Sequence, residues 1–132
     1  RVFVIGGGDT AMDCVRTSLR LQDAQGFGSD VTCAYRRTEA EMPGNRVERE
    51  NAREEGAHFE WLTAPKRFIG DENGQLTGIE FVRMRLGEPD ESGRRRPVEI
   101  LDSEYLEPGD QILVRRITRD ALKLIGVGRE VI

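Results

Sequence analysis

The sequence predicts an α/β protein with a parallel sheet and flanking helices, and two observations near its N-terminus support this. Val2 to Ile5 form a short apolar run, followed at once by three glycines and then by helical spacing from Thr10 to Gln22. A second apolar run, Val31 to Tyr35, comes next. Strand, helix and strand in so short a span make a βαβ unit, which pairs its strands in parallel through a right-handed crossover.

The glycines after the first predicted strand match a dinucleotide-binding fingerprint, because Gly6-x-Gly8-x-x-Ala11 has the form G-x-G-x-x-G/A between a strand and a helix. Gly6 permits the tight turn, Gly8 lets a pyrophosphate approach the backbone, and Ala11 lets the helix pack closely. We expect Asp9 or Thr10 to cap the helix, whose free N–H groups would face the phosphates. The candidate residues are Gly6, Gly7, Gly8, Asp9, Thr10 and Ala11; the alternative is a tight turn without a ligand.

The residues after the second predicted strand favour NADP(H) over NAD(H). NAD-binding proteins place an acidic residue there to bind the ribose hydroxyls, whereas this chain has Arg36 and Arg37. A guanidinium group binds a 2′-phosphate through paired, charge-assisted hydrogen bonds. Arg46, at the start of a charged helix predicted over residues 46–55, is a further candidate for holding a phosphate. The alternative for these arginines is a solvated surface.

The pattern changes after Pro65 and predicts an antiparallel three-stranded β-meander over residues 65–101. Its strands are expected at residues 66–70, 76–86 and 98–101, and Asn73-Gly74 marks the first hairpin. Ile79 and Phe81 alternate out of phase with Val82 and Met84, so we expect a bulge or a change of packing near Phe81 and Val82. A strand over residues 111–114, after a strand over residues 58–62 earlier in the chain, is expected in the parallel sheet, and a short helix is expected over residues 120–125.

Composition limits the other classes of function. The chain has 132 residues and a net charge of −4, which fits one domain and disfavours nucleic acid as a partner, the basic run Arg94 to Arg96 included. No apolar run reaches 18 residues, so no membrane span is expected.

Cys14 and Cys33 lack metal or redox spacing, which fits reduced cysteines and a cytoplasmic protein. No catalytic residue and no metal ligand is assigned. The chain begins at Arg1 without a visible signal peptide, and we expect it to be a piece of a longer polypeptide.

Several stretches together resemble the NADPH-binding domain of the small (β) subunit of bacterial glutamate synthase. More broadly, the chain is similar to the flavin subunits of dihydropyrimidine dehydrogenase and of ferredoxin:NADP oxidoreductases. The matching stretches are VIGGGDTAMDCVRTSLR (4–20), VTCAYRR (31–37), EMPG (41–44), NAREEGAHF (51–59) and LGEPDESGRRRP (86–97). The chain departs from this family after its last predicted strand, where Arg115 and Arg116 replace an Ala-x-Gly turn.

The resemblance implies a Rossmann-like NAD(P)-binding domain over residues 1–132, inserted into an FAD-binding domain. NADPH would lie over the glycine turn and pass a hydride to FAD, and electrons would continue through iron–sulfur clusters to the large subunit for glutamate biosynthesis. FAD, the clusters and their ligands would lie outside this chain, so the isolated fragment would be inactive alone. The alternative function is a nucleotide-binding regulatory or interaction module without electron transfer.

Overall fold

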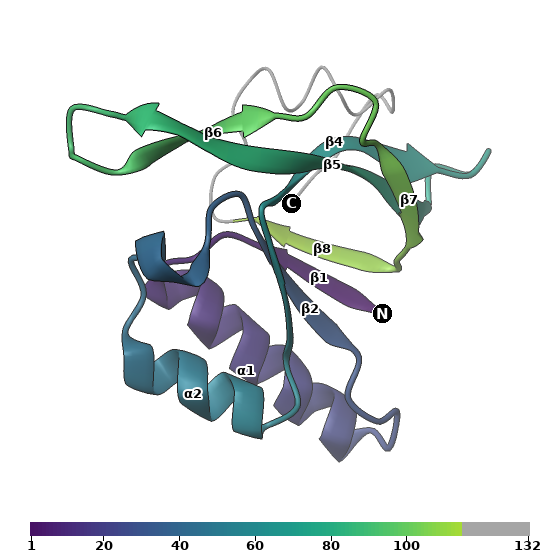
Figure 1. The fold of residues 1–132 in the computed structure, drawn as a ribbon. Helices are drawn as coiled ribbons and strands as arrows, with labels where there is room; N and C mark the ends of the chain where they lie inside the picture. Colours follow the sequence, from purple (N-terminus) through teal and green to yellow (C-terminus); the bar gives the residue numbers. More distant parts are fainter. Residues whose placement is uncertain (115–132) are drawn as a thin grey trace.

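The protein is described by a computed structural model over residues 1–114, and these residues form three layers (Figure 1). The central layer is a four-stranded parallel sheet in the order β3-β2-β1-β8, made of β1 (Val2–Ile5), β2 (Val31–Tyr35), β3 (His58–Trp61) and β8 (Gln111–Val114). Helices α1 (Asp9–Ala24) and α2 (Arg46–Glu54) cover one face of this sheet, and an antiparallel sheet covers the other. The α/β fold with a parallel sheet is therefore confirmed.

Alternation along β1 explains why both faces of the parallel sheet are covered. Val2 and Val4 belong to a buried cluster with Met12 and Val15 of α1. Phe3 points to the opposite face, where its ring centroid lies 5.3 Å from that of Phe81 in the antiparallel sheet. Side chains in a strand point alternately to the two faces, so a short, fully apolar strand is stable only when both faces are buried.

The antiparallel sheet contains β4 (Thr63–Gly70), β5 (Leu76–Pro89), β6 (Arg95–Glu99) and β7 (Tyr105–Pro108). The strand order is β4-β5-β6, and β7 also pairs with β5. The predicted antiparallel meander is thus confirmed, but its third strand is Arg95–Glu99 and not residues 98–101, and β7 is an additional strand that we did not predict. The irregularity expected near Phe81 and Val82 lies in the partner strand β4, whose register shifts between Pro65 and Arg67, opposite Phe81 and Glu80.

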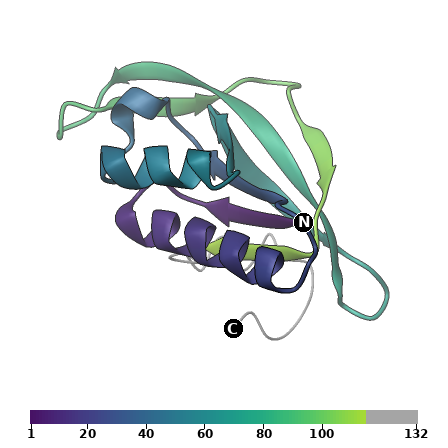
Figure 2. The ribbon, with the colours of Figure 1, turned by 90° about the horizontal axis from the view of Figure 1, so that it is seen from below.

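The helices lie side by side beneath the sheet (Figure 2) and are joined by ion pairs. Arg16 of α1 donates hydrogen bonds to Glu48 of α2 and to Glu55 just after it, the latter at 2.7 Å between Nη2 and Oε1. At the start of α2, the Asn45 side chain accepts a hydrogen bond from the Val47 amide at 2.8 Å. This contact satisfies one of the N–H groups that a helix start leaves without an intrahelical partner.

The start of α1 differs from our prediction. Its N-cap is Gly8, in an extended conformation and without a side-chain cap, so the expectation that Asp9 or Thr10 caps the helix is wrong. The physical reason is that the helix begins at Asp9, so Asp9 and Thr10 both lie inside its first turn; the Asp9 carboxylate instead accepts a hydrogen bond from the Asn45 amide at 2.8 Å.

Two sequence predictions fall outside the described residues: the helix over residues 120–125 and the replacement of the Ala-x-Gly turn at residues 115 and 116. Within residues 1–114, no helix combines the length and the hydropathy that crossing a membrane requires.

Candidate functional site

The glycine turn connects the carboxyl end of β1 to α1 and is held by β2. Gly6 has φ +137°, a conformation that residues with a Cβ rarely adopt. Its amide donates a hydrogen bond to the Ala34 carbonyl at 3.1 Å, and its carbonyl accepts one from the Cys33 thiol at 3.2 Å. A Cβ at Gly6 would lie 3.7 Å from the Cβ of Ala11, which agrees with the expected role of a small residue at that position.

Gly7 is buried beneath the segment that follows β2. A Cβ at Gly7 would lie 2.7 Å from Cε2 of Tyr35 and 2.9 Å from Cγ of Met42. The Gly7 carbonyl also accepts a hydrogen bond from the Gly44 amide at 2.9 Å. The segment of residues 42–45 therefore packs on the turn and fixes its conformation. Apart from the Met-Pro-Gly turn, nothing in the sequence indicated this contact.

The first turn of α1 is suited to an anion. Its N-cap has no side-chain partner, and the first N–H groups of an α-helix lack intrahelical acceptors. The helix is 16 residues long, and its dipole places partial positive charge at this end. The turn also lies where β1 has β2 on one side and β8 on the other, which is the switch point at which open α/β sheets bind ligands.

Arg36 and Arg37 follow β2 at the same edge of the sheet as the glycine turn, because Ile5 and Ala34 are paired residues of adjacent parallel strands. The two arginines have different environments. Arg36 is exposed, and it pairs with no carboxylate in the described part of the chain. Arg37 is only 4% exposed, and its guanidinium binds the Arg95 carbonyl at 2.7 Å and the Asp90 carboxylate at 3.3 Å.

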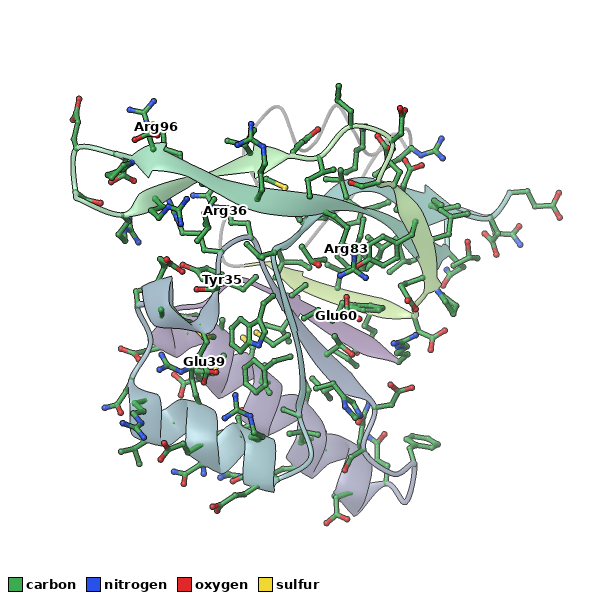
Figure 3. All side chains as sticks on the ribbon, in the orientation of Figure 1. Tyr35, Arg36, Glu39, Glu60, Arg83 and Arg96 are labelled. Atoms are coloured by element: carbon green, nitrogen blue, oxygen red, sulfur yellow. The ribbon has the colours of Figure 1, made fainter. Side chains whose placement is uncertain are left out.

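The hairpin of β5 and β6 therefore reaches the end of β2, and sequence reasoning missed this contact. Figure 3 shows Arg36 beneath this hairpin and Arg96 on its opposite side. Two features of the sequence could have indicated this contact. One is an arginine directly after the end of a buried strand, and the other is a distant aspartate, Asp90, in a turn. Asp90 closes the hairpin by accepting hydrogen bonds from the amides of Ser92 and Arg94.

The remaining candidates are engaged in other contacts or buried. Arg46 begins α2, is 82% exposed in its side chain, and pairs with Glu50 at 2.8 Å. Cys14 and Cys33 are free thiols, and burial raises the pKa of Cys33 to about 12, which disfavours its thiolate. No group of three His, Cys, Asp or Glu side chains within residues 1–114 is arranged to hold a metal ion.

A parallel sheet, a glycine turn at its switch point and a long helix starting at that turn define a dinucleotide-binding fold of the Rossmann type. Mycobacterium tuberculosis FprA in complex with NADPH has this fold: it matches 86% of this chain and 38% of its own, with a TM-score of 0.69 and 15% sequence identity. No protein-family model matches the chain.

The particular relatives are oxidoreductases. The chain is 56% identical over 113 residues to "Putative oxidoreductase AegA" of Escherichia coli, covering 86% of this chain and 16% of that protein. It is 50% identical over 114 residues to the "Glutamate synthase [NADPH] small chain" of Escherichia coli, covering 86% of this chain and 23% of that protein. The chain thus spans about a fifth of the length of these relatives and is homologous to one segment of them. The resemblance inferred from its sequence motifs is confirmed.

Proposed function

We propose that this chain is the NADPH-binding domain of a flavin-dependent oxidoreductase, and that glutamate synthase is the enzyme to which it contributes. The observation that carries the proposal is the juxtaposition, at one edge of the parallel sheet, of the uncapped start of α1 with the guanidinium of Arg36, which pairs with no carboxylate within residues 1–114. The names of the relatives, one of which contains NADPH, support the same assignment.

The two ends of the dinucleotide would contact different groups. The backbone N–H groups between Gly8 and Ala11 would bind the pyrophosphate, since they lie at the positive end of the helix dipole. Gly6 and Gly7 would act by shaping the turn. Asp9 would hold the segment of residues 42–45 against it, and Thr10, which is exposed, would lie beside the phosphates.

The arginines would bind the adenosine end. The Arg36 guanidinium is exposed and free to form charge-assisted hydrogen bonds with the 2′-phosphate. Arg37, which is buried and paired with Asp90, would anchor the loop to the hairpin of β5 and β6, and its predicted contact with the 2′-phosphate stays a prediction. The Arg46 guanidinium is paired with Glu50. Its contact with a phosphate stays a prediction.

When bound, NADPH supplies a hydride for reduction of a flavin, and the chain's residues hold and orient the dinucleotide for that transfer. FAD, iron–sulfur clusters and the large subunit of glutamate synthase are proposed partners outside this chain. Because both cysteines are free thiols, we place the protein in the cytoplasm.

Calorimetric titration with NADP⁺ and NAD⁺ tests this function. We expect the wild-type protein to bind NADP⁺ more tightly, and Arg36→Gln to weaken NADP⁺ binding by about 1.5–3 kcal/mol, the contribution typical of hydrogen bonds to charged groups. NAD⁺ binding should not change. The matched control is Arg85→Gln, which removes an exposed arginine from β5. Equal affinity of the wild-type protein for both dinucleotides would refute the assignment.

A further inference from the structure

The hairpin of β5 and β6 brings a third arginine toward the site. The carbonyl of Arg95 accepts the 2.7 Å hydrogen bond from Arg37 Nε, so the backbone of β6 lies directly against the residue that follows Arg36. The side chain of Arg95 lies near the same loop. The pKa of Glu41, four residues after Arg37, is lowered chiefly by the Thr38 hydroxyl and, more weakly, by the charge of Arg95.

The Arg95 guanidinium is held in place without being neutralised. Its Nε donates to the Gly87 carbonyl at 3.0 Å, and its Nη2 donates to the Leu86 carbonyl at 2.9 Å. Carbonyl oxygens fix the guanidinium without forming an ion pair, and the Glu41 carboxylate interacts with its charge only through space. Arg37, in contrast, is paired with Asp90. Within the described residues, no carboxylate forms an ion pair with Arg95 or with Arg36, so both retain charge for an anionic ligand.

The irregular pairing of β5 with β6 determines the position of the Arg95 guanidinium. The pairing of β5 with β6 shifts register between Leu86 and Pro89, and the two carbonyls that hold Arg95 lie at this irregularity. A bulge leaves backbone groups out of the regular ladder and turns the strand. The same hairpin sends Arg96 to the opposite side, as Figure 3 shows, because successive residues of a strand alternate.

We propose that Arg95 is a specificity-determining residue of the NADPH site, which binds the 2′-phosphate of the dinucleotide together with Arg36. The inference rests on the function proposed above. It adds that the antiparallel sheet takes part in recognition of the dinucleotide, through a guanidinium that its own backbone holds in position.

Titration calorimetry of the full-length gene product with NADP⁺ and with NAD⁺ tests the inference. Arg95→Gln should weaken NADP⁺ binding roughly tenfold and leave NAD⁺ binding unchanged. Arg95→Lys, which keeps the charge, should retain part of the lost affinity. The matched control is Arg96→Gln, which removes the same charge from the adjacent position on the other side of the hairpin. It should leave both affinities unchanged.

The outcomes separate this inference from the function on which it rests. If Arg36→Gln removes the preference for NADP⁺ while Arg95→Gln leaves it intact, the role of Arg95 is refuted and the proposed function stands. If Arg95→Gln weakens NADP⁺ and NAD⁺ equally, the residue only stabilises the hairpin, and the role is again refuted. If the wild-type protein shows no preference for NADP⁺, the proposed function itself fails.

Discussion

Gly7→Ala tests whether the segment after β2 fixes the glycine turn. The added Cβ would lie 2.7 and 2.8 Å from two ring atoms of Tyr35 and 2.9 Å from Cγ of Met42, all closer than real contacts allow. Met42 is unbranched and can shift, but the Tyr35 ring is buried and its hydroxyl donates to the Glu41 carbonyl at 3.1 Å. Overpacking of this kind costs about 1–3 kcal/mol, so we expect a loss of stability in that range.

Urea unfolding followed by circular dichroism measures this loss, and a double-mutant cycle assigns it to its cause. In a Tyr35→Leu background, which lacks the Cε2 atom, Gly7→Ala should be less costly than in the wild-type protein. A free energy of unfolding unchanged by Gly7→Ala would mean that the turn is not packed as described. An equal cost in both backgrounds would show that the Tyr35 ring is not the obstacle.

Two further predictions concern stability. The hydrogen bond from Arg16 lowers the pKa of Glu55 from its usual 4.5, so this carboxylate stabilises the fold above that pH and loses its contribution as the pH falls through the lowered value. Glu55→Gln should therefore reduce the loss of stability in acid, measured by thermal unfolding between pH 3 and 7, whereas the control Glu54→Gln should not; the same acid sensitivity in both would contradict the linkage. Tyr105→Phe removes the hydroxyl that donates to Glu60 at 2.9 Å but keeps the ring packed near Phe81, so it should cost about 1 kcal/mol in urea unfolding. No change in stability would mean that this hydrogen bond adds nothing to the packing of the two sheets.

The parallel core was predictable because its signals are local. Val2 to Ile5 and Val31 to Tyr35 are apolar runs bounded by turn residues. The glycines after the first run permit the tight turn into the helix that connects the two strands. The antiparallel strands β4 and β5 were predictable because Asn73-Gly74 separates two runs with strand character. Each of these signals lies within a few residues of the structure that it determines.

The missed features depend on contacts between distant residues. Strand β7 carries little strand signal in Tyr105–Pro108, and it forms because Gly78 to Phe81 offer an open edge for pairing. The different environments of Arg36 and Arg37 could not be read from two adjacent arginines. They arise because Asp90 and the Arg95 carbonyl, more than 50 residues away, bind only the second one.

The most direct measurement is a crystal structure of the protein with bound NADPH. We expect the pyrophosphate to lie against the amides at the start of α1 and the 2′-phosphate to lie within hydrogen-bonding distance of Arg36. A dinucleotide bound away from the glycine turn, or a 2′-phosphate directed into solvent, would contradict it.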